Sequence, residues 1–281
     1  MKLIDSIQRM AMLSKILKKE SKTVGFVPTM GYLHDGHLSL IKTAKQHTDI
    51  VVVSIFVNPK QFSPDEDLAS YPRDIKRDEE MARLAGADVL FNPSVEDMYP
   101  EGYATYVDVK GPADTLCGKM RPGHFRGVAT VVIKLFGIVK PDIAYFGQKD
   151  AQQSIIIRKM VEDLNMDIYI KVLPTVREKD GLAMSSRNTY LSEKERMDAL
   201  CLNQALEKCE EAVKSGERDA VKIIKMMEKI IKAKPTARID YIEAVDMKTL
   251  RAVSTVSGGT LMALAVFIGK TRLIDNAILN P

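Results

Sequence analysis

Short apolar runs alternate with longer amphipathic segments in the first part of the chain. Residues 23–27 and 49–57 are rich in β-branched and other apolar side chains, a composition typical of strands buried on both faces. Between them, Leu38, Ile41 and Ala44 recur at helical spacing. The pattern predicts a strand, a helix and a second strand, and this alternation favours a parallel sheet.

The same alternation continues as far as residue 172. Further strands are expected at residues 88–91, 103–109, 143–146 and 167–172, and further helices at residues 74–85, 128–139 and 150–164. Residues 1–22 mix apolar positions with Lys, Arg, Asp and Glu and lack a sustained apolar core. They therefore predict an amphipathic helix rather than a secretory signal.

The pattern changes near Pro174. Two charged helices are expected at residues 192–215 and 218–232, followed by short strands at residues 238–245, 260–267 and 271–277. Helices and strands that are segregated in this way indicate a small α+β domain. We therefore expect an α/β protein with a Rossmann-like, doubly wound parallel sheet in residues 1–174 and a smaller C-terminal α+β domain in residues 175–281.

Composition and charge restrict the partners. The chain is 46% hydrophobic and 28% charged, as in a soluble globular protein, and its net charge of +4 suits anionic small molecules without requiring nucleic acid. The longest apolar stretch, residues 261–268, is too short to span a membrane. Cys201 and Cys209 would lie about 12 Å apart along a helix, too far for a disulfide. With Cys117 as the third thiol, we expect reduced cysteines and a cytoplasmic protein.

Residues 27–37, VPTMGYLHDGH, lead from the first strand through a loop into a helix. A helix N-terminus offers unpaired N–H groups and a partial positive charge, and Gly31 and Gly36 allow a ligand close to the backbone. His34 and His37 stand three positions apart in the first turn, which favours phosphate binding. An ordinary surface turn and a metal site are the alternatives. The four histidines and three cysteines form no close ligand pattern, which disfavours the metal.

A second junction of the same kind follows the strand at residues 143–146. Gly147 ends that strand, and Lys149 stands at the start of the next helix. Ligands of open parallel sheets lie beyond the carboxyl ends of strands, so the two junctions are expected to face one another across a nucleotide. Residues 118–127 form a basic, glycine-rich loop with Arg121 and His124. For that loop, a structural role and a substrate contact both stay open.

Three motifs together resemble the nucleotidyltransferase superfamily that includes class I aminoacyl-tRNA synthetases. HDGH at residues 34–37 is similar to the HIGH motif, Lys149 follows, and MSSR at residues 184–187 is similar to a degenerate KMSKS motif. The surrounding segments are PTMG at 28–31, FVNPKQF at 56–62, YPR at 71–73, RPGHF at 121–125, FGQKDAQQ at 146–153 and MSSRN at 184–188. They make the whole chain similar to the pantoate–β-alanine ligase (pantothenate synthetase) family.

Three positions depart from the expected pattern. Gln148 stands where the family pattern suggests Glu, Ala151 where it suggests an aromatic residue, and Arg187 where the wider superfamily has Lys. Gln148 and Ala151 are expected to tune packing beside the ligand groups. Arg187 keeps the positive charge but changes its geometry.

The resemblance implies the ATP-dependent condensation of (R)-pantoate with β-alanine to pantothenate. The pantoate carboxylate attacks the α-phosphorus of ATP, and the β-alanine amine then attacks the acyl carbon of pantoyl adenylate and releases AMP. Mg²⁺ is expected to bridge phosphate oxygens of ATP with few protein ligands. The resemblance implies a homodimer with no nucleic-acid or membrane partner. Another adenylyl or cytidylyl transferase of the superfamily, an RNA-binding module and a non-catalytic nucleotide scaffold are the alternatives.

The resemblance also assigns site residues. It implies that His37, His34 and Lys149 are catalytic, with His37 as proton donor in such families, although on physical grounds we weight its electrostatic role more heavily. The residues implied to bind ATP are Met30, Gly31, Tyr32, Leu33, His34, Asp35, Gly36, His37, Gly147, Gln148, Lys149, Asp150, Val176, Met184, Ser185, Ser186 and Arg187. Pantoate is assigned to Gln61, Gln153 and Met30, and β-alanine to Gln61, with no metal site built from protein side chains.

These residue types also have ordinary roles. Lys149 would otherwise be an exposed cation, Ser185 and Ser186 a helix cap or turn, and Gln61 and Gln153 surface amides. For each, the functional interpretation rests on the joint pattern.

Overall fold

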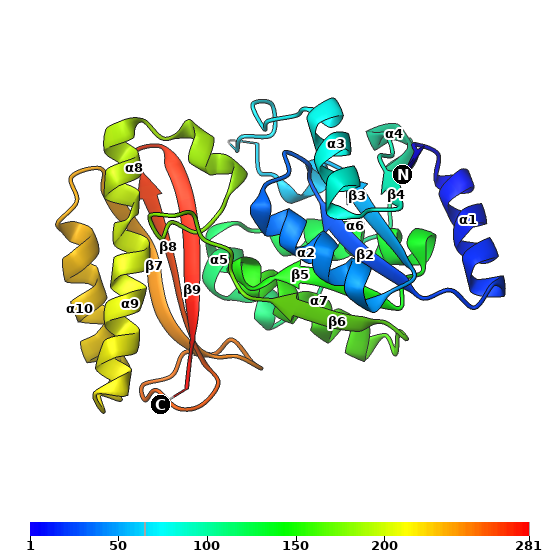
Figure 1. Ribbon diagram of the computed structural model, residues 1–281. Helices are drawn as coiled ribbons and strands as arrows, with labels where there is room; N and C mark the ends of the chain where they lie inside the picture. The colour runs from blue at the N-terminus through cyan, green and yellow to red at the C-terminus, as the bar shows by residue number, and fades with distance from the viewer. Residues whose placement is uncertain (65, 281) are drawn as a thin grey trace.

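A six-stranded parallel sheet forms the larger part of the molecule. The computed structural model describes residues 1–64 and 66–280 (Figure 1). The strands lie in the order β1-β4-β3-β2-β5-β6, and all neighbouring pairs are parallel. Their bounds are β1 (Lys2–Ile4), β2 (Val24–Thr29), β3 (Ile50–Ile55), β4 (Val89–Phe91), β5 (Ile143–Gly147) and β6 (Tyr169–Leu173). The predicted α/β class is confirmed.

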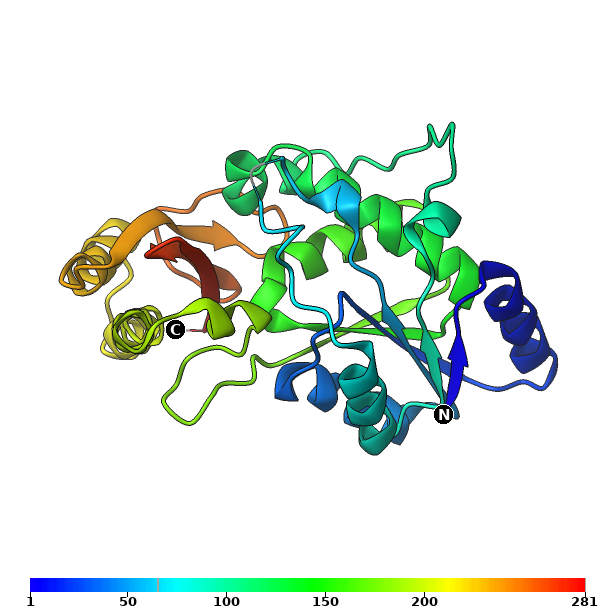
Figure 2. The ribbon, with the colours of Figure 1, turned by 90° about the horizontal axis from the view of Figure 1, so that it is seen from above.

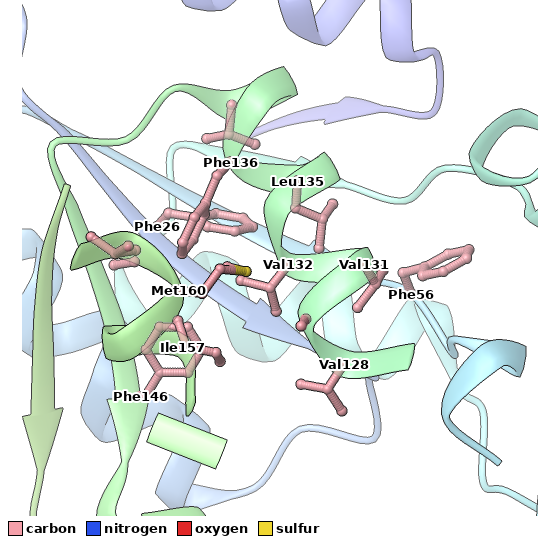
Figure 3. Packing of buried hydrophobic residues seen from close by; sticks show 14 of the residues in the cluster. Phe26, Phe56, Val128, Val131, Val132, Leu135, Phe136, Phe146, Ile157 and Met160 are labelled. Carbon is pink, nitrogen blue, oxygen red and sulfur yellow. The ribbon is translucent and has the colours of Figure 1, made fainter. Parts of the chain in front are cut away.

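Helices cover both faces of this sheet (Figure 2). Side chains of α1 (Ile7–Lys19), α6 (His124–Val139) and α7 (Ala151–Asp163) pack on one face, and those of α2 (Asp35–His47) and α3 (Ile75–Ala85) on the other. Successive strand residues point to opposite faces, so Phe26 joins the first group and Val27 the second. Figure 3 shows Phe26 against Phe136 of α6, with ring centroids 6.3 Å apart.

The strand order changes direction beside β2. From β2 the chain moves outward through β3 and β4, and it then returns to place β5 on the other side of β2. The carboxyl ends of β2 and β5 therefore lie side by side, and α2 and α7 begin beyond them. This is the position at which open α/β sheets bind ligands.

The second sheet is antiparallel and has three strands. These are β7 (Ala237–Asp246), β8 (Thr260–Ile268) and β9 (Thr271–Leu279). α9 (Cys201–Lys214) and α10 (Ala220–Lys232) share a hydrophobic cluster with it, and the short α8 (Glu193–Ala199) precedes them (Figure 1). A separate cluster joins Leu261 and Ala263 of β8 to Leu116 and Ala151. The second sheet is thus packed against the first part of the chain.

Shorter helical turns connect these elements. They are η1 (Pro59–Gln61), α4 (Val95–Met98), η2 (Pro112–Asp114), α5 (Leu116–Met120), η3 (Gln148–Asp150) and η4 (Ser186–Tyr190). Cys117, Cys201 and Cys209 are buried free thiols, as expected. Among the described residues, none of the helices combines the length and apolarity needed to cross a membrane.

The strand predicted at residues 103–109 does not form. Tyr103 instead stacks edge-on against Tyr99 and Tyr106, and the Val107 N–H donates to Thr130 Oγ1 rather than to a neighbouring strand. These tertiary contacts replace the ladder that the local pattern suggested.

Three further predictions of secondary structure were wrong. β1 was not expected within the first amphipathic segment, because its three residues gain strand structure only by pairing with β4. Much of the loop predicted at residues 118–127 is helical, since α6 begins at His124 and α5 ends at Met120. The helix predicted over residues 192–215 is divided at Leu200 into α8 and α9.

Candidate active site

A cavity of about 1330 Å³ lies at the carboxyl ends of β2 and β5. It extends to β9 of the second sheet, so both parts of the chain contribute to its wall. The predicted site residues that line it are Met30, His34, Gly36, His37, Gln61, Gly147, Lys149, Asp150, Gln153, Val176, Met184, Ser185, Ser186 and Arg187. The structure therefore brings together side chains from four separate segments, as the sequence motifs predicted.

Five residues of the predicted ATP site lie off the cavity wall: Gly31, Tyr32, Leu33, Asp35 and Gln148. The N–H groups of Tyr32 and Leu33 donate to the carboxylate of Asp78, over 2.6 and 2.7 Å. Asp78 comes from α3, and its side chain is only 2% exposed. Burial raises the pKa of this carboxyl group, although both N–H groups act in the opposite direction. The loop amides of Tyr32 and Leu33 are thus already hydrogen-bonded within the protein.

The paired histidines stand at the junction between β2 and α2. His34 is the N-cap of α2, and the centroids of the His34 and His37 rings are 4.0 Å apart. A Cβ atom on Gly36 would lie 2.9 Å from Nδ1 of His34, so any other residue at this position would displace the ring. Both imidazoles line the cavity.

Both imidazoles are neutral near pH 7. Burial, assisted by the charge of Lys149, lowers the pKa of His34 to about 4. Burial, His34 and Lys149 lower the pKa of His37 well below its usual value. The His34 N–H donates to Nδ1 of His37 over 3.3 Å, which assigns the ring hydrogen of His37 to Nε2. Nδ1 of His34 is buried without a hydrogen-bond partner among the described residues.

The turn between β5 and α7, which carries Lys149, is held by the C-terminal sheet. Nζ of Lys149 lies 4.0 Å from a carboxylate oxygen of Asp150, beyond hydrogen-bond distance. The side-chain amide of Asn276 on β9 donates to the main-chain oxygens of Gln148 and Lys149, over 2.9 and 3.0 Å. Asn276 therefore fixes the turn that carries the lysine, and no motif in the sequence indicated it.

The loop of residues 184–188, called the serine loop here, also lines the cavity. Ser185 caps η4, because its Oγ accepts the Arg187 N–H over 3.3 Å, so the ordinary capping role is present for this residue. Ser186 Oγ lies 3.2 Å from the hydroxyl of Tyr71. Nε and Nη2 of Arg187 donate to the two carboxylate oxygens of Asp67, over 2.9 and 2.8 Å.

Gln61 is held at both its side chain and its main chain. Asn58, which is 1% exposed, donates from Nδ2 to Oε1 of Gln61 over 3.0 Å. Asn58 is itself fixed by the Gly127 oxygen at 3.1 Å and by the Tyr99 hydroxyl at 2.8 Å. These contacts leave the Nε2 donor of Gln61 near Sδ of Met30, at 3.2 Å, on the cavity wall.

Arg121 and His124 bind the main chain of Gln61. Nη1 of Arg121 lies 3.1 Å from Nε2 of His124, which must accept because a guanidinium only donates. Nδ1 of His124 therefore carries the hydrogen and donates to the Gln61 oxygen over 2.7 Å. Burial and the charge of Arg121 lower the pKa of His124 to about 4. Arg121 is in turn paired with Glu66, with Nε 2.7 Å from Oε1.

The two neighbouring glutamines of α7 differ. Gln152 is buried and binds the main chain at Pro112, Thr115 and Cys117, so its role is structural. Gln153 lines the cavity and makes no side-chain hydrogen bond to another described residue. Residues 1–64 and 66–280 contain no cluster of three His, Cys, Asp or Glu residues that could hold a metal ion.

Comparison with known proteins places this geometry in context. A family model described as pantoate-beta-alanine ligase matches residues 2–278. A pantothenate synthetase of Pelotomaculum thermopropionicum is 58% identical over 263 residues, which cover 94% of this chain and 93% of that protein. One from Caldicellulosiruptor bescii is 55% identical over 280 residues, which cover 100% of this chain and 99% of that protein.

Solved structures give the same match. The crystal structure of pantothenate synthetase from Thermus thermophilus has a TM-score of 0.95 and 44% identity, and the alignment covers 100% of both chains. That of a pantoate-beta-alanine ligase from Francisella tularensis, complexed with beta-gamma ATP and beta-alanine, has a TM-score of 0.83 and 37% identity. It covers 99% of this chain and 97% of that chain.

Proposed function

Because the chain belongs to the pantoate–β-alanine ligase family, it is a ligase that makes pantothenate from pantoate, β-alanine and ATP, and we propose that the described cavity is its active site. One observation supports this most strongly. Two neutral imidazoles, the ammonium of Lys149 and the guanidinium of Arg187 line one cavity together with Gln61, although they come from distant parts of the chain. Donors for phosphates and an amide for a hydroxy acid thus share one space.

The first step joins (R)-pantoate to ATP. A carboxylate oxygen of pantoate bonds to the α-phosphorus while the bond to the pyrophosphate oxygen breaks, which gives pantoyl adenylate and pyrophosphate. Negative charge grows on the phosphates in this step, and preorganised donors stabilise it. We assign this task to His34, His37 and Lys149, assisted by Ser186 and Arg187.

His37 is assigned an electrostatic role. A neutral imidazole whose hydrogen is on Nε2 donates a hydrogen bond to an anion without giving up its proton. Mg²⁺ would be supplied with ATP as part of the substrate and would neutralise charge on the phosphates. With this ion and the cationic side chains of the cavity, the leaving pyrophosphate would require little protonation.

The second step transfers the pantoyl group. The amine of β-alanine attacks the acyl carbon, the bond from that carbon to the AMP oxygen breaks, and pantothenate leaves with AMP.

The two glutamines are assigned to the acid substrates. Gln61 and Gln153 are neutral, so in the first step they orient pantoate while its carboxylate stays nucleophilic. Gln61 also contacts β-alanine in this proposal.

The rest of the nucleotide is assigned by position. Asp150 and Gly147 stand beside Lys149 on the cavity wall and suit the ribose hydroxyls, since a carboxylate accepts from both. The main chain of Val176, on the same wall, is assigned to adenine. Residues 175–281 then form a smaller domain that brings the serine loop over ATP, whereas residues 1–174 bind both substrates of the first step.

Two broader proposals concern the whole protein. Three free, buried cysteines are typical of a reducing compartment, which supports a cytoplasmic location. The family resemblance supports a homodimer, and light scattering at several protein concentrations tests it.

Isotope exchange tests the proposed function. With Mg²⁺, ATP and (R)-pantoate but without β-alanine, labelled pyrophosphate should enter ATP, and this exchange should require pantoate. Addition of β-alanine should then yield pantothenate and AMP in equal amounts. An active protein that shows no pantoate-dependent exchange would contradict the adenylate route. Exchange with phosphopantetheine in place of pantoate would favour a different transferase.

A further inference from the structure

Two adjacent carboxylates connect the two sides of the proposed active site. Glu66 and Asp67 follow one another on the loop between η1 and α3, and both line the cavity. Glu66 binds Arg121, and Asp67 binds Arg187. Each pair uses two nitrogens of the guanidinium and both carboxylate oxygens, an arrangement that fixes direction as well as distance. The substrate assignments above include neither carboxylate.

Glu66 is connected to the part of the cavity that is assigned to pantoate. Its partner Arg121 holds Nε2 of His124, and His124 in turn donates to the main-chain oxygen of Gln61. Arg121 also contacts that oxygen directly through Nη2, at 3.3 Å. The position of the Gln61 backbone therefore depends on a chain of contacts that begins at Glu66.

Asp67 contacts a residue of the part of the cavity that is assigned to ATP. It occupies Nε and Nη2 of Arg187, while Nη1 has no hydrogen-bond partner among the described residues. The same loop holds the serine loop at two further points. The Tyr71 hydroxyl lies 3.2 Å from Ser186 Oγ, and the Tyr190 hydroxyl donates to the Ser70 oxygen over 3.3 Å. Asp67 thus fixes the edge of the Arg187 guanidinium that carries Nε and Nη2, and Nη1 stays available as a donor to a ligand.

Both carboxylates are ionised at neutral pH. Burial acts to raise the pKa of each group, but the hydrogen bonds and charge of Arg121 and Arg187 outweigh it and hold both pKa values below the usual range. Neither arginine is left with an uncompensated charge in a partly buried position.

We propose that Glu66 and Asp67 are positioning residues with separate tasks in the same reaction. Glu66 places Gln61 for pantoate through Arg121 and His124, and Asp67 places the guanidinium of Arg187 for the polyphosphate of ATP. The inference rests on the proposed function of this cavity. It predicts that two neighbouring residues of the same charge have different kinetic effects.

Glu66→Gln and Asp67→Asn are matched variants. Each removes one negative charge and keeps the size of the side chain, and the two sites are adjacent in the chain, so each serves as the control for the other. A group displaced by about 1 Å loses about 10²-fold in rate. Asp67→Asn should therefore lower kcat of pantoate-dependent pyrophosphate exchange about 10- to 100-fold with little change in the KM for pantoate. Glu66→Gln should raise that KM about 10-fold with a smaller effect on kcat.

A double-mutant cycle separates positioning from general stabilisation. In an Arg187→Ala background, Asp67→Asn should have little further effect on exchange, because the group that it positions is gone. Asp67→Asn should also leave the second half-reaction unchanged when pantoyl adenylate and β-alanine are supplied. Thermal unfolding of each variant shows whether a loss of activity follows a loss of fold.

Each outcome supports or overturns the inference. Absence of exchange in the wild-type protein means that the proposed function has failed. An active wild type whose two variants share one kinetic profile, or whose Asp67→Asn effect is fully retained without Arg187, overturns the positioning roles alone. A lower kcat for Asp67→Asn and a higher KM for pantoate for Glu66→Gln, with the Asp67→Asn effect lost in the cycle, support them.

Discussion

The two sides of the cavity are prepared in different ways. On the nucleotide side, two donors lack a protein acceptor among the described residues: Nζ of Lys149 is 4.0 Å from a carboxylate oxygen of Asp150, and Nη1 of Arg187 has no hydrogen-bond partner. On the acid side, Gln61 has both of its oxygens bound by Asn58 and His124, and one donor faces the cavity.

The difference follows the charge of the two ligands. A triphosphate carries several negative charges and can itself provide acceptors for the donors that the protein leaves unpaired on that side. Pantoate must keep a nucleophilic carboxylate, so that side offers a neutral, oriented amide. The nucleotide side therefore keeps charged donors available for its ligand, whereas the acid side offers neutral donors.

Removal of a nucleotide-side donor should have the largest effect. His37→Ala should slow adenylate formation about 10²- to 10³-fold, because it deletes a preorganised donor to the phosphates, while ATP binding weakens far less. Pyrophosphate exchange gives the rate, and calorimetric titration gives the affinity for ATP. His47→Ala is the matched control, since His47 ends the same helix outside the cavity. A change confined to KM for ATP would contradict the assignment.

Loss of an acid-side amide should mainly affect binding. Gln61→Ala and Gln153→Ala should each raise the KM for pantoate about 10- to 100-fold, the range expected for a hydrogen bond to a charged group. The KM for ATP should change little in the same steady-state assay. Gln204→Ala, at an exposed position of α9, serves as the surface-amide control. Unchanged pantoate dependence in both cavity variants would remove these residues from the pocket.

Gly127 of α6 packs closely against the backbone of η1, which carries Gln61. A Cβ atom on Gly127 of α6 would lie 2.2 Å from the Lys60 oxygen and 2.7 Å from the Gln61 nitrogen. Gly127→Ala should therefore displace η1, destabilise the fold by about 1–3 kcal/mol and raise the KM for pantoate.

Gly137 on the same helix provides the contrast. Apart from the backbone of its own helix, no atom of residues 1–64 and 66–280 lies within 4 Å of a Cβ added at Gly137, so Gly137→Ala should stabilise the protein by about 0.5–1 kcal/mol and leave KM unchanged. Urea unfolding measures both variants. Equal stability of the two proteins would mean that α6 and η1 do not need this close approach.

The smallest effect concerns pH. His34 and His124, one on each side, have pKa values of about 4, against 6.5 without burial. Between these values the unfolded chain binds more protons, so the free energy of unfolding should fall as pH drops from 6.5 toward 4. His124→Gln should make this slope shallower by at most about 1.4 kcal/mol per pH unit. Urea midpoints from pH 7 to 5 test it, and an unchanged slope would indicate that His124 is not buried as a neutral group.

The sequence predicted elements whose pattern is local. The alternation of apolar strands and amphipathic helices identified β2, α2 and β3, because each contains enough residues to show its own period. β1 could not be found in this way, since three residues have no measurable period and their partner is β4. Residues 103–109 have strand composition, but aromatic packing of Tyr103 overrides it.

The site shows the same limit. Motifs predicted His34, His37, Lys149 and the serine loop, because each of them lies within a short local sequence pattern. Asp78 and Asn276 were missed because each binds main-chain groups of a segment far away in the sequence. The motif also included Tyr32 and Leu33 as neighbours of the histidines, whereas folding directs their N–H groups to Asp78.

The contact of Asn276 with the turn at Lys149 has a consequence for biosynthesis of the protein. The six parallel strands are complete once Leu173 has been translated, and this sheet is able to begin folding while the ribosome is still adding residues. Asn276 is added more than a hundred codons after Lys149. The nascent chain can therefore assemble its larger sheet early, but it acquires a fully supported lysine turn only when β9 emerges from the exit tunnel.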